Sequence, residues 1–442
     1  MPDRLPQDGR VLVPAGTATE DNPFMRPPPS PPHDLHCRFC EAPLRQSFAD
    51  LGMSPLSNSF LRAEQLNRME PFYPLHAYVC AACFLVQLEA FETPEHIFSD
   101  YAYFSSYAET WLRHAEAYAE AMIQRFGFGP GQRIVEVASN DGYLLQYFAR
   151  RGIPVLGVEP AANVARSAVA KGIPTEVLFL GERTGQTLAA QGKQGDLLIG
   201  NNVLAHVPAL NDFVKGLRAL LKPQGILTME FPHLLNLIEQ GQFDTIYHEH
   251  FSYLSLYTVA QVFERHAMAL FDVEAIPTHG GSLRIFVRHA TDRTHASTPR
   301  VQAMIAREER AGLRSLATYA AFPARIEQVK LDLLEFLLQA RRAGKRVAGY
   351  GAPAKGNTLL NYCGIRTDLL AYTVDRSPQK QGLFLPGTHI PIHAPGHLAE
   401  TRPDYVLILP WNLRDEITEQ QRDVREWGGR FVVAIPRLEV LP

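Results

Sequence analysis

The segment "RIVEVASNDGYLLQYFARRGIPVLGVEP", residues 133–160, decides the fold, because two short β-rich runs flank a small-residue turn and a helical segment. The same alternation of strand and helix continues to about residue 231. The predicted strands are 133–138, 155–160, 175–179, 196–202 and 226–231, and the predicted helices are 143–151, 161–171 and 209–221. Strands that alternate with helices form a parallel sheet with helices on both faces. We therefore predict a doubly wound α/β sheet in the middle of the chain.

Two further patterns follow this central sheet. Residues 269–277 and 282–289, which are separated by "THGG", predict an antiparallel pair of strands at the sheet edge. A helical stretch from about 300 to 342 comes next. A second, shorter α/β pattern starts at 346–351 and continues almost to the last residue. The C-terminal part is therefore predicted to be a second, Rossmann-like α/β domain.

Four of the five cysteines form two Cys-x-x-Cys pairs, Cys37 with Cys40 and Cys80 with Cys83. Two such pairs are typical of a tetrahedral zinc site, because each pair supplies two thiolates from one tight turn. Redox pairs or disulfides are the alternatives, and they need a thioredoxin-like setting or an oxidising compartment. Four protein ligands leave no position for a substrate, so we predict a structural zinc ion in an N-terminal lobe.

The composition excludes several classes of function. A net charge of −3 over 442 residues gives no electrostatic reason to expect a nucleic acid partner. No apolar run is long enough to span a membrane, and the first residues lack the apolar core of a secretory signal. We expect a cytoplasmic protein that is a monomer or a weak oligomer and that acts on a small molecule.

Polar residues at the end of the first predicted strand indicate a cofactor site. Glu136 is followed by a turn with Asn140, Asp141 and Gly142, and in open α/β sheets ligands bind beside this turn. Glu159, at the end of the next strand, is placed to accept hydrogen bonds from ribose hydroxyls. A dinucleotide needs a G-x-G-x-x-G turn, whereas this turn reads A-S-N-D-G and adds a carboxylate that repels a pyrophosphate. We predict S-adenosylmethionine rather than NAD; the alternatives are a plain βα turn and a solvated Glu159.

The segment "GNNVLAHVP" follows the fourth predicted strand at the same edge of the sheet. Asn202 and His206 could face the cofactor or the substrate there. Alternatively, the asparagine is an ordinary turn residue and the histidine lies at a helix N-terminus.

The segment "DTIYHEHFSY", residues 244–253, gathers several groups that can move a proton. If the segment is extended, Tyr247 and Glu249 share one side while His248 and His250 share the other. If it is helical, the two histidines diverge. A metal site formed by the two histidines and the glutamate is one alternative, but adjacent ligands on one strand cannot easily cap one face of an ion. A hydrogen-bonded core segment without chemistry is the other alternative.

Proton transfer is the interpretation that fits the predicted cofactor. A methyl group moves from a sulfonium to carbon only if the carbon is nucleophilic, and a saturated carbon becomes nucleophilic by losing a proton beside a carbonyl. Histidine is the commonest base and contributes about 100- to 10,000-fold. A tyrosine or a second histidine can stabilise the enolate oxygen, and a glutamate can orient the base. A nicotinamide-dependent oxidoreductase acting on a sugar nucleotide and a non-catalytic zinc-binding adaptor are the alternative functions.

The motifs "CRFC", "VCAAC", "EVASNDG", "NNVLAHV", "YHEHFSY", "THGGSLR" and "GYGAPAKGNTLLNY" together resemble the sugar C-methyltransferases. These enzymes use S-adenosylmethionine to make branched deoxysugars on nucleotide carriers. The resemblance spans about 33–440 and implies C-3 methylation of a TDP-4-keto-deoxyhexose. It identifies His250 with the base and four other residues with the surroundings of the sugar: Tyr247, Glu249, His206 and Tyr101. The resembling family usually carries glycine where this chain has Ala138.

The resemblance also concerns the C-terminal domain, which in that family helps to hold the nucleotide-sugar. Its loop, G-x-G-x-x-x-x-G from Gly349, is longer than a dinucleotide fingerprint. Lys355, together with the Asn357 side chain at a helix N-terminus, could bind the diphosphate. Alternatively, Lys355 is a solvated surface residue.

The sequence thus predicts five parts. They are a disordered proline-rich tail (1–32), a zinc-binding lobe (33–92), an S-adenosylmethionine-binding methyltransferase domain with a helical lead-in (93–295), a helical connector (296–342) and a C-terminal substrate-binding domain (343–442).

Overall fold

The computed structural model describes residues 35–93, 106 and 109–441 of the chain. The predicted proline-rich tail and Tyr101 lie outside the described residues. From Leu35 onward, the described residues form one compact unit. None of their helices combines the length and the apolar character that crossing a membrane requires.

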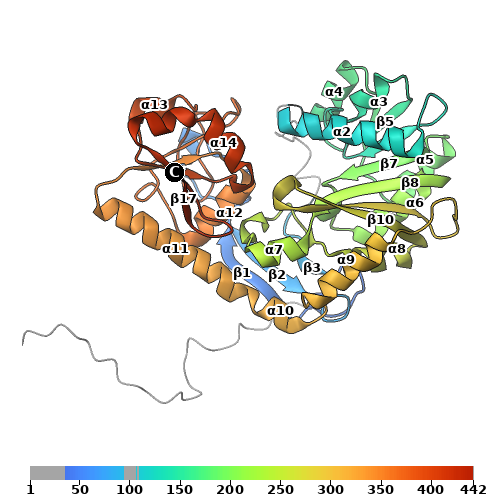
Figure 1. Cartoon of the computed structure of the whole chain (residues 1–442), viewed down its shortest axis with the longest axis horizontal. Coiled ribbons are helices and arrows are strands. Elements are labelled where there is room, and N and C mark those ends of the chain that lie inside the picture. The colour runs from blue at the N-terminus through green and yellow to red at the C-terminus, as the bar shows by residue number, and fades with distance from the viewer. Residues whose placement is uncertain (1–34, 94–105, 107–108, 442) are drawn as a thin grey trace, which may run out of the picture. The chain divides into compact units, whose positions relative to one another are not determined.

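The central sheet has seven strands in the order β10-β11-β8-β7-β4-β5-β6 (Figure 1). The strands are β4 (Ile134–Val137), β5 (Val155–Val158), β6 (Thr175–Glu176), β7 (Gly195–Asn201), β8 (Leu221–Pro232), β10 (Met268–Ile276) and β11 (Ser282–His289). All neighbouring strands are parallel except β11, which is antiparallel to both β8 and β10. Chain order reverses at β4, which makes its carboxyl end the point where ligands bind in such sheets. The predicted doubly wound sheet is confirmed.

Helices cover both faces of this sheet, and each face has its own apolar core. The helices are α2 (Glu109–Phe126), α3 (Leu145–Ala149), α4 (Ala162–Ala170), α5 (Glu182–Ala190), α6 (Leu210–Leu220) and α8 (Leu256–Arg265). Helix α5 was not predicted from the sequence. Strand β6 is shorter than the predicted 175–179, because its partner β5 ends at Val158, which pairs with Glu176.

The N-terminal lobe is a four-stranded antiparallel sheet in the order β1-β2-β3-β9. Three strands come from the lobe itself: β1 (Gln46–Ser54), β2 (Tyr73–Val79) and β3 (Val86–Leu88). The fourth, β9 (Ser252–Tyr253), comes one residue after the YHEH segment, Tyr247–His250, and pairs with Val86 and Gln87 of β3. The lobe sheet therefore holds one end of the segment that carries the predicted base. Short helices precede β9: η4 (Leu204–His206), α7 (Leu234–Gln240) and η5 (Phe243–Thr245).

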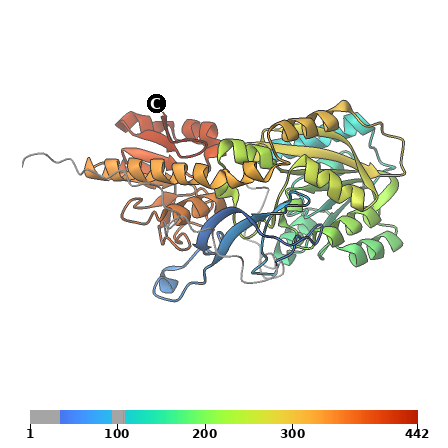
Figure 2. The same cartoon turned by 90° about the horizontal axis from the view of Figure 1, so that it is seen from below.

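The predicted helical stretch consists of three helices, α9 (Pro299–Arg310), α10 (Leu316–Ala320) and α11 (Phe322–Arg342). Gly312, with a φ of +86°, ends α9 in a left-handed conformation that a residue with a side chain rarely adopts. Helix α11 contacts both β1 of the lobe and α12 of the C-terminal domain. Figure 2 shows this helix, in orange, running along the C-terminal domain.

The C-terminal domain has a second sheet in the order β14-β13-β12-β15-β16-β17, parallel except for β17. Its elements are β12 (Val347–Tyr350), α12 (Ala354–Cys363), β13 (Thr373–Val374), β14 (Ile392–His393), α13 (His397–Thr401), β15 (Tyr405–Ile408), η7 (Trp411–Leu413), α14 (Arg414–Gln420), η8 (Arg422–Trp427), β16 (Arg430–Val433) and β17 (Glu439–Leu441). The predicted second α/β fold is confirmed. Its core is continuous with the apolar side chains of the lobe sheet.

Candidate active site and zinc site

The four paired cysteines form one cluster in which all sulfur atoms lie within 4.8 Å of one another. The Sγ atoms of Cys37 and Cys83 are 3.5 Å apart, and those of Cys40 and Cys80 are 3.4 Å apart. A tetrahedral zinc with Zn–S bonds of about 2.3 Å has S–S edges of about 3.8 Å. The cluster therefore fits a zinc ion with four thiolate ligands, and none of these cysteines is in a disulfide.

The two cysteine turns have the same backbone geometry. Glu41 and Phe84, which follow the second cysteine of each pair, have φ values of 65° and 61°. Their N–H groups donate to the carbonyls of Cys37 and Cys80, each over 2.9 Å. In addition, the Gln87 side chain donates to the Cys37 sulfur over 3.2 Å, a contact that stabilises a thiolate. Sequence reasoning found the ligands but not Gln87, which no spacing rule indicates.

Four carboxylates gather at the carboxyl ends of the central strands. They belong to Glu136 on β4, Asp141 in the following turn, Glu159 after β5 and Glu230 on β8. Burial raises the pKa of Glu136 well above its usual value, and the three other negative charges add to this shift. One of its oxygens, Oε2, has no hydrogen-bond partner among the described residues. Such a site favours a bound cation and disfavours a diphosphate.

Two of these carboxylates are held by the protein itself. Asp141 pairs with Lys171 over 2.7 Å. Glu159 is buried, and its two oxygens accept the N–H groups of Asn140 (2.9 Å) and Ala161 (2.8 Å). The alternative of a solvated Glu159 is therefore wrong. Each of its oxygens keeps a second lone pair for a ribose hydroxyl.

The same edge of the sheet combines backbone strain with unsatisfied polar atoms. Ala138, Asn140 and Asn202 have φ values of 56°, 51° and 54°, a region that non-glycine residues seldom occupy outside functional sites. Buried polar atoms without a partner in the described part of the chain lie here, namely Ser139 Oγ, Asp141 Oδ1, Asn201 Oδ1 and Nδ2, and Asn202 Oδ1. These donors and acceptors, together with the carboxylates, fit the adenosine, amino and sulfonium groups of S-adenosylmethionine.

Gly142, in the same turn, has a φ of +74°, and a Cβ atom there would lie 3.0 Å from Ile173 Cγ1. Glycine at this position is therefore required by the turn itself.

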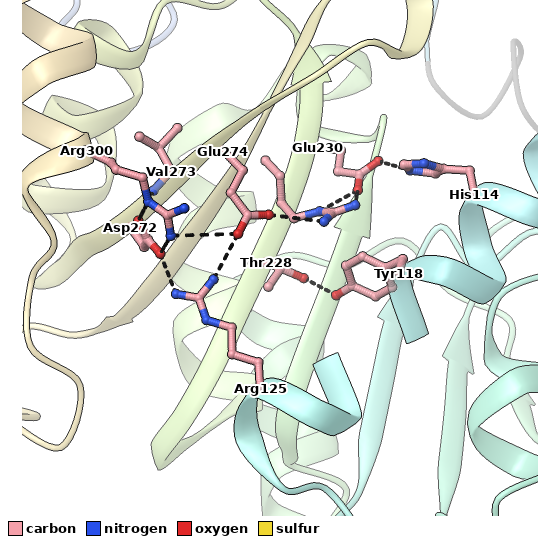
Figure 3. A network of polar contacts seen from close by, with 10 residues as sticks. His114, Tyr118, Arg125, Thr228, Glu230, Asp272, Val273, Glu274 and Arg300 are labelled. Carbon is pink, nitrogen blue, oxygen red and sulfur yellow. Dashed lines mark hydrogen bonds and ion pairs between the residues drawn. The ribbon is translucent and has the colours of Figure 1, made fainter. Parts of the chain in front are cut away.

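Ion pairs and hydrogen bonds, shown in Figure 3, hold helix α2 against the central sheet. His114 pairs with Glu230 of β8 over 2.8 Å, and Arg125 pairs with Glu274 of β10 over 3.1 Å. Arg284 lies between the two glutamates, at 2.6 Å from Glu230 and 3.2 Å from Glu274. These contacts fix the start of the helix beside the carboxylate cluster.

The first turn of α2 places an aromatic side chain at the site. The Trp111 ring stacks on His114 with centroids 5.0 Å apart, and lies 6.1 Å from the Tyr143 ring and 5.2 Å from the His279 ring. His279 also contacts Asn202, over 3.1 Å. Neither the tryptophan nor His279 was singled out from the sequence, since both come from outside the strand ends.

The YHEH segment forms a turn, in which the His250 N–H donates to the Tyr247 carbonyl over 2.9 Å. His250 Nδ1 lies 2.9 Å from the Thr245 carbonyl, and because a carbonyl can only accept, Nδ1 carries the proton. Nε2 therefore has the lone pair, and it accepts the Tyr247 hydroxyl over 2.7 Å. The segment is therefore not an extended strand at this point, and Tyr247 and His250 lie on the same side of the turn.

His206 completes this group, since its ring centroid lies 4.7 Å from that of His250. Burial lowers the pKa of His206 to about 4. Burial, together with the neighbouring His206, lowers the pKa of His250 well below its usual value. Both imidazoles are therefore neutral at pH 7, and the His250 lone pair is available to accept a proton.

Glu249 and His248 point to other partners. The Asn58 side chain of the lobe donates to Glu249 over 2.6 Å. Burial raises the pKa of Glu249 to about 6, against the opposing effects of Asn58 and Lys380. His248 contacts the Pro74 carbonyl over 3.2 Å. The Thr245 carbonyl, not a glutamate, thus orients the predicted base, and the metal alternative is not supported because its three side chains diverge.

The C-terminal domain contributes Lys355, which lies in the first turn of α12. Its Nζ lies 2.9 Å from Asn412 Oδ1 and 4.7 Å from the centre of the Trp411 ring, so it is not a solvated surface residue. Asn357 is buried and donates to the Ser57 carbonyl over 2.6 Å. Asn357 is therefore hydrogen-bonded to the lobe, because the turn after Ser54 reaches α12. The sequence had instead predicted that its side chain contacts a ligand.

Asp244, the first residue of the segment 244–253, is a site residue that the sequence pattern does not indicate. It is fully buried, and its Oδ2 accepts the indole N–H of Trp411 over 2.7 Å. Burial raises its pKa to about 6. No sequence pattern indicates this contact, because the two residues are 167 positions apart in the chain.

The central domain is similar to methyltransferase domains. A family model described as "Methyltransferase domain" matches residues 111–267. Over 97 residues the chain is 31% identical to a ubiquinone biosynthesis O-methyltransferase of Roseobacter denitrificans, covering 22% of this chain and 39% of that protein. A solved S-adenosylmethionine dependent methyltransferase from Mesorhizobium loti covers 40% of this chain and 100% of its own, at 15% identity and a TM-score of 0.33. Strand order, acidic strand ends and the matching family model define an S-adenosylmethionine-dependent methyltransferase.

Two further comparisons cover the flanking regions and the whole chain. Family models for a methyltransferase-associated zinc binding domain and for a "C-methyltransferase C-terminal domain" match residues 37–98 and 277–436. C-methyltransferase NovU from Streptomyces niveus is 36% identical over 405 residues, which is 92% of this chain and 96% of that protein. The chain therefore belongs to the C-methyltransferase family. The predictions of family, cofactor and zinc are confirmed, and the oxidoreductase and adaptor alternatives are wrong.

Proposed function

We propose that the protein methylates a carbon next to a ketone, through an enolate that a histidine base generates. The proposed substrate is a TDP-4-keto-deoxyhexose, with C-3 as the methylated carbon. The observation that carries this proposal is the neutral His250 imidazole, whose Nε2 lone pair is directed by the Thr245 carbonyl behind it. A methyltransferase that acts on oxygen needs no such carbon acid chemistry.

The geometry supports a defined order of contacts. The α-carbon of the ketone must displace the Tyr247 hydroxyl from Nε2 of His250, because both compete for the same lone pair. The displaced hydroxyl is then free to donate to the carbonyl oxygen of the same substrate. His206, whose ring lies beside that of His250, is the second candidate for this donation. Preorganised donors of this kind are worth about 100- to 1,000-fold each.

S-adenosylmethionine supplies the electrophilic methyl group when it is bound. Glu136, with its unpartnered oxygen, would face the positive charge of the cofactor, and Glu159 would accept the ribose hydroxyls. Asp141, Asn140, Gly142 and Asn202 would shape the rest of this edge. Because the methyl donor is cationic, the acidic strand ends stabilise its binding more than that of its neutral product.

The nucleotide part of the substrate is assigned to the C-terminal domain, and the five-part division of the chain remains a prediction. Tyr101, which lies outside the described residues, remains a proposed sugar contact. Hydrogen bonds join the lobe, the YHEH turn and the C-terminal domain to one another. These contacts support a site to which all three parts contribute.

Two measurements test this function. Calorimetry should detect binding of S-adenosylhomocysteine and no binding of NAD, because the carboxylate cluster repels a diphosphate. Incubation with a labelled methyl donor and a panel of TDP-4-keto sugars should give a product heavier by one labelled methyl group in place of a hydrogen, with the label on a carbon next to the ketone. Label on oxygen, or no transfer to any keto sugar in the panel, would contradict the proposal.

A further inference from the structure

Lys355 lies in the first turn of α12, and α12 is held against the segment that leads to the predicted base. The Thr358 hydroxyl of α12 donates to the Ile246 carbonyl over 3.0 Å. Asp244, two residues earlier, accepts the indole N–H of Trp411. Both contacts fix the C-terminal domain beside the turn that contains Tyr247 and His250.

The ammonium of Lys355 is only partly satisfied by the protein. One N–H donates to Asn412 Oδ1 over 2.9 Å, and the face of the Trp411 ring attracts the charge at 4.7 Å. Among the described residues no third acceptor contacts Nζ. A lysine has three N–H donors, so at least one remains for a ligand.

The positive charge of Lys355 acts on two imidazoles of the site. Burial is the main cause of the low pKa values of His250 and His279, and the positive charge of Lys355 contributes at both. His279 is joined to Trp411 through its neighbour Gly280, where a Cβ atom would lie 2.5 Å from the Trp411 ring. Close backbone approach at this glycine thus brings the THGG loop, Trp411 and the lysine together.

A buried negative charge alone does not explain why a lysine lies at this position. Asp244 attracts it, yet the Asp244 carboxylate bonds the indole instead, and its Oδ1 has no partner in the described part of the chain. A cation that lies on the Trp411 ring next to the THGG loop, with an N–H donor left over, is suited to a negative charge that appears only during a reaction.

We propose that Lys355 is a catalytic residue that donates an N–H to the enolate oxygen, and that it is not an anchor for the diphosphate. This inference rests on the proposed function. The α-proton passes to Nε2 of His250, and the C–H electron pair forms the enolate, whose oxygen accepts the N–H of Lys355. The α-carbon then attacks the methyl carbon, the C–S electron pair leaves with the neutral thioether, and the enolate returns to the ketone. The proton on His250 is released to solvent.

The test separates enolate formation from nucleotide binding. With S-adenosylhomocysteine bound, TDP-4-keto-6-deoxyglucose in D₂O should exchange its α-proton for deuterium, read by mass spectrometry. Lys355→Met keeps most of the length of the side chain and removes the charge and the N–H donors. We expect the exchange rate at saturating substrate to fall by about 100- to 1,000-fold, with the Kd for TDP within about twofold of the wild type.

Lys345→Met is the matched control, because it removes an exposed lysine of the same domain that pairs with Asp404. It should leave both the exchange and the TDP affinity unchanged, and thermal melting should show that both variants fold. If Lys355→Met exchanges at the wild-type rate while its Kd for TDP rises tenfold or more, the lysine is a diphosphate anchor and the inference is wrong. Absence of exchange in the wild-type protein would instead overturn the proposed function, and the inference with it.

Discussion

Two buried carboxyls near the YHEH turn, Asp244 and Glu249, have a pKa raised to about 6. Burial is the main cause for Glu249, which is protonated below pH 6 and carries a charge above it. The neighbouring His206 titrates lower, at about 4, and His250 is also shifted well downward. The imidazoles therefore stay neutral over a range in which the carboxyl changes its charge.

We predict that the turnover rate falls as the pH drops through about 6, because the ionised Glu249 is lost there. In Glu249→Gln this acid limb should disappear, with a lower rate at pH 8. In Asn58→Ala the limb should move to higher pH, because Asn58 donates to the carboxylate and lowers its pKa. A limb that stays near pH 6 in Glu249→Gln would show that another group titrates.

A substitution at Ala138 tests whether its left-handed backbone conformation lowers the stability of the fold. Its φ of 56° costs an L-residue about 1–2 kcal/mol, whereas glycine adopts this region freely at an entropic cost of about 0.5–1 kcal/mol. We expect Ala138→Gly to raise the free energy of unfolding by about 0.5–1 kcal/mol in urea denaturation. The control Ala324→Gly, at an exposed position of α11, should lower it by about 1 kcal/mol. Equal losses in both variants would refute the strain argument.

At the scale of elements, the zinc lobe has a role beyond its own stability. Its sheet takes up β9, which begins two residues after His250, and its Asn58 side chain holds Glu249. The cysteine cluster packs into the same apolar core as helices α6 and α8 of the methyltransferase domain. The metal site therefore stabilises the scaffold that holds one end of the turn with the proposed base.

Removal of the metal should abolish methyl transfer without any zinc taking part in the reaction. Structural zinc contributes about 10 kcal/mol or more to folding a small lobe. We predict one zinc per chain by elemental analysis, and loss of both zinc and activity in Cys80→Ser. The control Cys363→Ser removes a buried thiol outside the cluster and should retain its zinc. Full activity of a zinc-free protein would contradict this role.

At the scale of the whole molecule, the parts of the site that follow local patterns could be predicted from the sequence. The four cysteines have a fixed spacing, and Asp141 and Gly142 lie in the turn where a parallel sheet binds ligands. Strand-helix alternation gave both α/β folds. The length of β6 could not be predicted, because it depends on the end of its partner strand.

The remaining site contacts join distant segments and have no sequence signal. Asn58 meets Glu249 across 191 positions, and Trp411 meets Asp244 across 167. Lys355 was predicted as a ligand-binding residue, but its position on the Trp411 ring, in a helix packed against Ile246, follows only from the tertiary structure. Likewise, the turn that joins Tyr247 to His250 is set by tertiary contacts that override any simple alternation.

The proposed removal of a carbon-bound proton by His250 can be measured without methyl transfer, through hydrogen exchange in wild-type and variant protein. With S-adenosylhomocysteine and TDP-4-keto-6-deoxyglucose in D₂O, the wild type should incorporate deuterium next to the ketone. His250→Gln should slow this exchange by about 100- to 10,000-fold, while His248→Gln, in the same turn but bonded to Pro74, should retain it. Exchange at the wild-type rate in a folded His250→Gln variant would contradict the account.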